Sequence, residues 1–183
     1  MQNIIHSAAF IQGVGFAGMA AFFLSYQIKS NKALYICQFI GAALFCLQFL
    51  LLDAASGCFS LLLTMLRSLL LLRYNEWRWV RCKVLPLLLI GCFGAIMYYT
   101  WAGATSLLAF AASAFSTVCY WTNNARTIRM ANLLVASPCW LVHDYLTNSI
   151  GGMLCEGFTI VSILVSIYRF GWKALGEPEK TAE

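Results

Sequence analysis

The stretch ALYICQFIGAALFCLQFLLL, residues 33–52, holds no charged residue, and its only amides are Gln38 and Gln48. At a rise of about 1.5 Å per residue, a helix of this length matches the roughly 30 Å hydrocarbon core of a bilayer. Backbone polar groups at that depth must be satisfied within the segment itself. The stretch therefore predicts a transmembrane α-helix.

The composition of the whole chain extends this prediction. The 183 residues are 61% hydrophobic and only 10% charged, whereas a soluble domain carries roughly 25% charged residues. So few charges exclude an ordinary soluble enzyme, a disordered protein and a nucleic-acid-binding domain. The chain is expected to be an integral membrane protein.

Seven apolar runs are long enough to be considered as membrane spans. The third is the weakest, because it is short and contains Arg67. The predicted spans are Ala8–Gln27, Ala33–Leu52, Ser56–Leu72, Val84–Trp101, Ala104–Thr122, Met130–Leu146 and Ile150–Phe170.

The positions of the basic residues support seven spans. With this count, eleven of the twelve Lys and Arg residues fall on one side, whereas six or eight spans would scramble the alternation. Basic residues are enriched in cytoplasmic connections. We therefore predict a multi-pass protein of the bacterial inner membrane, with a periplasmic N-terminus and a cytoplasmic C-terminus.

The segment YNEWRWVRCK, residues 74–83, interleaves Trp77 and Trp79 with basic residues. An RNA-binding patch is conceivable, but Trp and Arg are also the types expected in the interfacial belt beside anionic lipid. We favour the belt, with membrane lipid as the partner and no nucleic acid. The predicted organisation is a first three-helix bundle (1–73), a cytoplasmic loop and linker helix (74–103), a second three-helix bundle (104–172) and a flexible cytoplasmic tail (173–183).

Spans one to three and spans five to seven align as an internal repeat. One linker span between two triplets gives both the same orientation, so the predicted fold is all-α transmembrane, with seven helices in a 3+1+3 arrangement of two parallel three-helix repeats. A shift of 94 residues pairs Tyr26 with Tyr120, Lys32 with Arg126 and Gln38 with Asn132. A shift of 95 pairs Gln48 with His143, Asp53 with Asn148, Gly57 with Gly152, Phe59 with Leu154 and Thr64 with Thr159.

Polar stripes occupy equivalent helices of the two repeats. Ser60, Thr64 and Arg67 share one face of the third span, by their spacing of four and three residues. Cys155, Thr159, Ser162 and Ser166 do the same on the seventh. Two alternatives remain open: facing walls of a central cavity, or helix packing through small polar residues.

Two ionisable residues lie inside predicted spans, Arg67 and Glu156. Each costs roughly 2.5–3.5 kcal/mol at the centre of an inserted helix, which makes both candidate functional residues. Three alternatives stay open: Arg67 extends toward the cytoplasmic interface, the two side chains pair, or they bind a polar solute. Glu156 is the stronger functional candidate, because no basic residue lies on its side of the membrane.

The sixth span carries Asn132, Ala136, Cys139 and His143 on one face, with Trp140 beside it. Pro138 removes a backbone donor and should kink this helix. Trp140 could stack on a solute, or it could form an outer cluster with His143 and Asp144.

No metal or cofactor is expected. None of the eight cysteines forms a CxxC pair, and their spacings match no zinc or haem pattern. We expect them to pack as small hydrophobic side chains.

Residues 139–157, CWLVHDYLTNSIGGMLCEG, resemble the characteristic stretch of the YgjV-type bacterial inner-membrane protein family. That family is similar to the SWEET and PQ-loop proteins, which also have three plus one plus three helices, and the resemblance implies a solute carrier. The matching elements are Cys139-Trp140, His143, Ser149 to Gly152, Glu156-Gly157, Arg169-Phe170 and Arg67.

The chain departs from the SWEET and PQ-loop pattern in two ways. Ser25-Tyr26-Gln27 and Cys119-Tyr120-Trp121 stand where the PQ-loop helices have Pro-Gln. Thr64 and Ser166 stand where SWEET sites have asparagines. Both departures argue against a sugar as the solute.

Three classes of function compete. The first is a passive or proton-coupled carrier of a small polar solute, and no GxxxxGK[ST] loop indicates ATP as the driver. The second is a membrane enzyme built on His143-Asp144, which we disfavour because GxSxG and HExxH patterns are absent. The third is a non-transporting partner or sensor subunit that binds through residues 74–83, and a homo-oligomer is among the open states of assembly. For the carrier, the predicted pathway residues are Gln38, Thr64, Arg67, Asn132, Trp140, His143, Glu156, Thr159 and Ser162.

Overall fold

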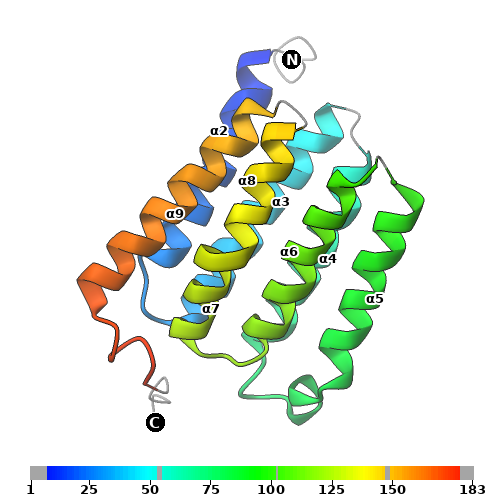
Figure 1. Ribbon diagram of the computed structural model, residues 1–183. Coiled ribbons are helices and arrows are strands. Elements are labelled where there is room, and N and C mark those ends of the chain that lie inside the picture. Colours follow the sequence, from blue (N-terminus) through cyan, green and yellow to red (C-terminus); the bar gives the residue numbers. More distant parts are fainter. Residues whose placement is uncertain (1–7, 53–54, 102, 147–148, 178–183) are drawn as a thin grey trace.

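The computed structural model describes residues 8–52, 55–101, 103–146 and 149–177, and all regular secondary structure in these ranges is helical (Figure 1). The α-helices are α2 (Ala8–Tyr26), α3 (Asn31–Leu51), α4 (Ala55–Leu72), α5 (Val84–Tyr99), α6 (Thr105–Tyr120), α7 (Ala125–Ala131), α8 (Ser137–Leu146) and α9 (Ile150–Phe170). A short 3₁₀ turn, η1 (Arg78–Arg81), lies in the connection between α4 and α5, and a π-helical turn, η2 (Asn132–Ala136), joins α7 to α8.

The predicted spans agree with these helices to within two residues, except for the sixth, which begins at Ala125 instead of Met130. The Asn124 side chain accepts hydrogen bonds from the backbone N–H groups of Arg126 and Thr127, both at 3.1 Å, and so caps this earlier start. The expected disruption at Pro138 takes the form of the π-helical turn directly before α8, because a proline cannot donate the usual backbone hydrogen bond.

Consecutive helices pack side by side and close a ring. α3 lies between α2 and α4, the continuous helix α7–α8 lies between α6 and α9, and α2 packs against α9. α5 contacts α4 and α6 at the other side of the molecule. Figure 1 shows the result as two layers, α2–α4 behind and α6–α9 in front, with α5 at the edge.

Four segments lie together at one end of the bundle, the lower end in Figure 1: residues 27–30, 73–83, 121–124 and 171–177. We call it the basic end, because Lys and Arg lie in three of these segments and in the adjoining turns of α3, α7 and α9, although residues 121–124 themselves hold none. α2 begins at the opposite end and α9 ends at the basic end. The chain therefore crosses the bundle an odd number of times. Residues 1–7 and 178–183, with Lys180 and most of the predicted tail, lie outside the described residues, as do Asp53 and Asn148.

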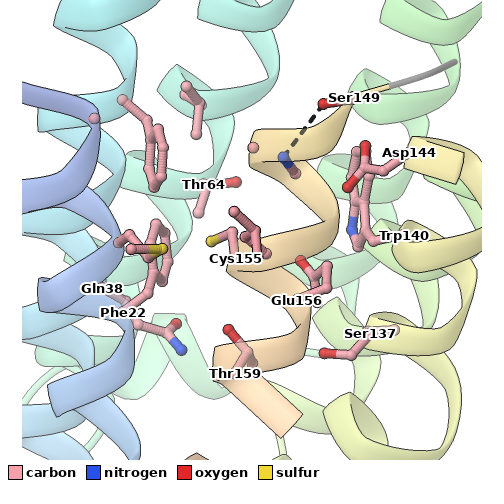
Figure 2. Close-up of a pocket in the computed structure, with 18 of the residues that line it drawn as sticks. Phe22, Gln38, Thr64, Ser137, Trp140, Asp144, Ser149, Cys155, Glu156 and Thr159 are labelled. Carbon is pink, nitrogen blue, oxygen red and sulfur yellow. Dashed lines mark hydrogen bonds between the residues drawn. The ribbon is translucent and has the colours of Figure 1, made fainter. Parts of the chain in front are cut away.

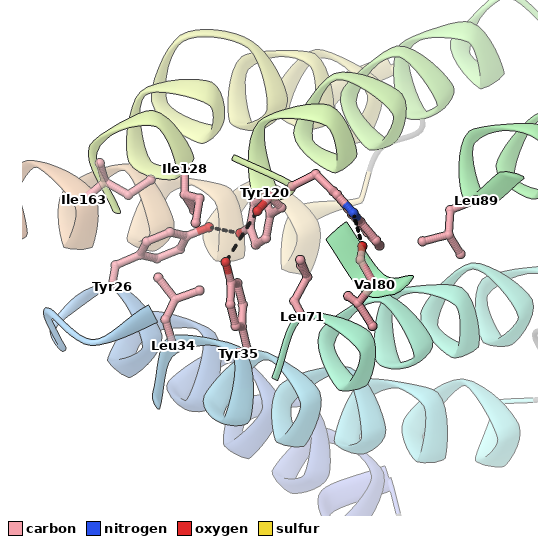
Figure 3. Packing of buried hydrophobic residues seen from close by; sticks show 10 residues of the cluster. Tyr26, Leu34, Tyr35, Leu71, Val80, Leu89, Tyr120, Ile128 and Ile163 are labelled. Atoms are coloured by element: carbon pink, nitrogen blue, oxygen red, sulfur yellow. Dashed lines mark hydrogen bonds between the residues drawn. The ribbon is translucent and has the colours of Figure 1, made fainter. Parts of the chain in front are cut away.

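A cluster of buried residues closes the basic end of the bundle (Figure 3). The Trp121 indole donates a hydrogen bond of 2.8 Å to the Val80 carbonyl, which fixes the connection between α4 and α5 against α6. The cluster consists of Tyr26, Leu34, Tyr35, Leu71, Val80, Leu89, Tyr120, Trp121, Ile128 and Ile163.

The outside of the bundle is apolar. Leu62, Leu66 and Leu69 on α4 and Val161 and Leu164 on α9 are exposed, as expected for a surface that faces lipid instead of water. Among the described residues, three helices are long and apolar enough to span a membrane: Ala9–Tyr26, Asn31–Leu51 and Ile150–Phe170. The apolar helices Cys58–Leu72, Val84–Tyr99 and Thr105–Tyr120 are shorter.

Candidate functional site

A cavity of about 620 Å³ lies between the two layers of helices (Figure 2). Within the described chain, α2, α3 and α4 line it on one side and α6, η2, α8 and α9 on the other, whereas α5 and α7 contribute no lining residue. It reaches from Gln12 and Ser149, close to the first turns of α2 and α9, to Tyr26 and Tyr120, which belong to the buried cluster at the basic end. Its size, with a mostly apolar lining and a few polar side chains, is typical of a small-molecule binding pocket.

Four of the seven residues of the polar stripes predicted from the sequence line this cavity. Thr64 and Arg67 of α4 and Cys155 and Thr159 of α9 all line it, and Figure 2 shows Thr64 and Cys155 in the same space. The prediction of two polar walls would be wrong if Thr64 and Thr159 faced lipid, but both line the cavity. Their use as a solute pathway stays a prediction.

A hydrogen-bonded cluster of two tyrosines and two amides forms the floor of the cavity. The hydroxyls of Tyr26 and Tyr120 lie 3.1 Å apart. Gln38 donates to both hydroxyls, at 3.3 Å to Tyr26 and 2.5 Å to Tyr120, and Asn132 donates to Tyr120 at 3.3 Å. We call these four residues the floor cluster. Because α2, α3, α6 and η2 each contribute one residue, the cluster ties the two layers together just above the buried end.

Arg67 lines the cavity directly beside the floor cluster. Its guanidinium carbon lies 4.5 Å from the centre of the Tyr120 ring, a favourable cation–π geometry, and Nη1 donates to the Thr117 hydroxyl at 3.2 Å. Within the described residues no ion pair joins Arg67 to Glu156. The side chain is only 7% exposed, so it neither extends to the interface nor pairs with the carboxylate considered from the sequence.

Glu156 occupies the opposite wall. Figure 2 shows it between α9 and α8, on the side of Ser137 and below Trp140 and Asp144, and all four residues line the cavity. A Cβ at Gly152 would overlap the Asp144 carboxylate. A larger residue at position 152 would therefore displace the Asp144 side chain from its present place.

Two of the predicted pathway residues lie elsewhere. Ser162 is completely buried between α9 and α2, where it accepts a hydrogen bond from Gln27 at 2.9 Å and donates to the Phe23 carbonyl at 2.6 Å. His143 is not among the lining residues, and it packs edge-on against Trp140 and lies 3.2 Å from an Asp144 carboxylate oxygen. The remaining seven, Gln38, Thr64, Arg67, Asn132, Trp140, Glu156 and Thr159, line the cavity together.

Sequence reasoning missed the two tyrosines as site residues. The repeat alignment pairs Tyr26 with Tyr120, which indicates a duplication but does not by itself place the two hydroxyls in a site. The same shift pairs Gln38 with Asn132, so the complete floor cluster consists of two aligned pairs. Polar residues that align between repeats were therefore the available signal for the floor of the site.

A helical bundle with an apolar exterior and an internal cavity that contains polar and ionisable side chains is typical of a multi-pass membrane protein. Residues 9–174 match the Imp-YgjV family, described as bacterial inner membrane protein, and the chain belongs to this family. The family predicted from residues 139–157 is thus confirmed, together with the inner membrane as the location. No curated protein and no solved structure matches the chain, and the relation to SWEET and PQ-loop proteins stays a prediction.

Proposed function

We propose that this protein carries a small polar solute across the inner membrane by alternating access. The two moving parts are the three-helix bundle α2–α4 and the bundle from α6 to α9, and α5 links them. The observation that carries the proposal is the extent of the cavity. Among the described residues its lining runs from Gln12 and Ser149, toward the end opposite to the basic end, to the floor cluster, and the buried cluster lies at the basic end.

The floor cluster supports a 3+1+3 repeat as the basis of this motion. Tyr26 and Tyr120, and likewise Gln38 and Asn132, are separated by 94 residues and meet in one network. Residues at equivalent positions of a parallel repeat are expected to meet at an axis along the membrane normal, between the repeats, where such transporters bind their substrates.

The basic end is proposed to face the cytoplasm, because connections rich in Lys and Arg resist translocation. The cavity then faces the periplasm, and the conformation is the outward-facing one. Rocking of the two bundles would separate Tyr26 from Tyr120 at the floor and close the walls around Gln12 and Ser149.

Uptake into liposomes tests the proposal. Purified protein is reconstituted and offered radiolabelled amino acids, hydroxy acids, sugars and polyols. We expect one class to enter faster than into protein-free liposomes. Thr159→Trp should abolish this uptake, because the indole fills the cavity, whereas Val161→Trp on the lipid-facing side of α9 should preserve it.

Two results would contradict the carrier. One is the absence of uptake above the protein-free rate for every solute, which would favour the non-transporting partner. The other is equal uptake by the Thr159→Trp and Val161→Trp proteins, which would separate the cavity from the flux.

A further inference from the structure

We infer that the cavity binds a small monocarboxylate that carries a hydroxyl or amino group, with Arg67 as the anion-binding residue and Gln38 as the acceptor for the second group. This inference deepens the proposed carrier by naming its substrate class. It rests on the polar balance of the cavity floor.

The first step is the charge of Arg67. A guanidinium has five N–H donors, but within the described residues the only hydrogen bond of Arg67 goes to Thr117, and Nε is buried without a partner. Burying a cation with so few partners is costly. A side chain that is 93% buried and borders a cavity, as Arg67 does, is therefore best explained by an anion that completes its hydrogen bonds.

The second step is Gln38. Its amide nitrogen donates to Tyr26 and Tyr120, but its carbonyl oxygen, Oε1, is buried and has no partner in the described part of the chain. A buried acceptor without a donor also costs free energy. Arg67 and Gln38 both contact Tyr120 and border the same cavity. One small ligand that offers an anion and a hydrogen-bond donor would therefore satisfy both groups.

The third step is the charge of the ligand. Arg67 is the single Lys or Arg among the described lining residues, and Asp144 and Glu156 also border the cavity. A phosphate monoester, with close to two negative charges, would be repelled by these carboxyl groups. One carboxylate matches one guanidinium, and its two oxygens fit the bidentate geometry of arginine. An amino group on the ligand would in addition be attracted by Glu156.

The thermal unfolding midpoint of the purified full-length protein tests the site without any need for transport. The probes are L-lactate and L-alanine, with lactamide, propionate, glycerol and glucose as matched compounds, all at equal ionic strength. L-Lactate or L-alanine should raise the midpoint by about 3 °C or more at about ten times its Kd. Removal of the charge in lactamide should weaken binding about a hundredfold, and removal of the hydroxyl in propionate about tenfold.

Variants separate a binding role of Arg67 from a structural one. Arg67→Gln should abolish the shift with L-lactate and L-alanine, Arg67→Lys should weaken it, and Arg73→Gln, an exposed residue of the basic end, should leave it unchanged. Without ligand, Arg67→Met should unfold at the same temperature as the wild type or at a higher one, because it removes a poorly compensated buried charge. A lower midpoint of Arg67→Met together with unchanged L-lactate and L-alanine binding by Arg67→Gln would overturn the inference.

Other outcomes also decide it. Stabilisation by glycerol or glucose but by no carboxylate would overturn the inference and leave the carrier intact. Carboxylate binding without any uptake into liposomes would support the inference and contradict the carrier. Stabilisation by none of the probes, or equal stabilisation by phosphatidylglycerol, which would assign Arg67 to a lipid, would overturn the inference.

Discussion

Arg129 shows how much a single buried side chain holds together. It is fully buried, although the predicted spans leave it in the cytoplasmic connection between the fifth and sixth spans. Its Nη2 atom donates to the carbonyls of Tyr26 and Ile28 at 2.9 and 2.8 Å, and its Nε atom donates to the Ser166 hydroxyl at 2.6 Å. Arg129 thereby binds the C-terminal end of α2, where carbonyls lack helical partners, to α7 and α9.

Substitution of Arg129 should therefore destabilise the fold. Arg129→Gln should lower the free energy of unfolding by about 2–4 kcal/mol, because two buried carbonyls lose their donor. Reversible unfolding in mixed micelles, followed by circular dichroism, would measure the loss. The exposed Arg78 of η1 provides the control, and Arg78→Gln should stay within about 0.5 kcal/mol of the wild type. Equal losses in both variants would refute the role of Arg129.

Glu76, in the connection between α4 and α5, should titrate below its usual range. A hydrogen bond from Arg73 is the main cause of its lowered pKa, and Lys32 at 3.5 Å contributes less. Because the folded pKa lies below the unfolded value, this interaction stabilises the fold above about pH 4.5 and is lost as the pH falls through the folded pKa. The ¹³C titration of the Glu76 carboxyl should move upward in Arg73→Gln and less in Lys32→Gln. An unchanged midpoint in Arg73→Gln would contradict the assignment.

At the scale of the elements, the length of each apolar run predicts most helix boundaries correctly. Prediction failed where a polar residue belongs to the helix itself. The sixth helix starts five residues early because Asn124 caps it and because Arg129 finds carbonyl partners inside the bundle. Hydropathy assigns both residues to a loop, because it contains no information about the carbonyl oxygens that accept hydrogen bonds from a buried arginine.

The crossing of α2 and α3 depends on Gly18 and Gly41. A Cβ at Gly41 would lie 3.2 Å from the Gly18 carbonyl oxygen and 2.9 Å from the Phe22 ring. Small residues allow such close approaches of helices in membranes. Gly41→Ala should therefore lower the free energy of unfolding by about 1–3 kcal/mol through overpacking. Gly91→Ala on α5, where a Cβ would meet no atom within 4 Å, should cost nothing, and the same unfolding experiment compares the two variants.

At the scale of the whole molecule, the walls of the cavity could be predicted from the sequence better than its floor. Thr64 lines the cavity together with Arg67, and Thr159 together with Cys155, because helical spacing fixes which residues share a face. Ser162 belongs to the same stripe but faces α2, since the stripe leaves the cavity where Gln27 and Phe23 cover it. The position at which the stripe leaves the cavity depends on how α9 crosses α2. The spacing of residues within one helix does not determine this crossing.

The orientation of the molecule decides what the cavity is exposed to, and native Cys82 can report it. Cys82 is exposed and lies at the basic end, outside the helices of the bundle. A membrane-impermeant maleimide should leave it unmodified in intact spheroplasts and modify it after permeabilisation, because basic connections stay in the cytoplasm. A cysteine introduced as Thr100→Cys, after the last residue of α5 at the opposite end, should react in intact spheroplasts. Cys92 within α5 is also exposed, so mass spectrometry of the labelled peptides distinguishes the sites. Labelling of Cys82 in intact spheroplasts would reverse the orientation, and the cavity would then take its solute from the cytoplasm.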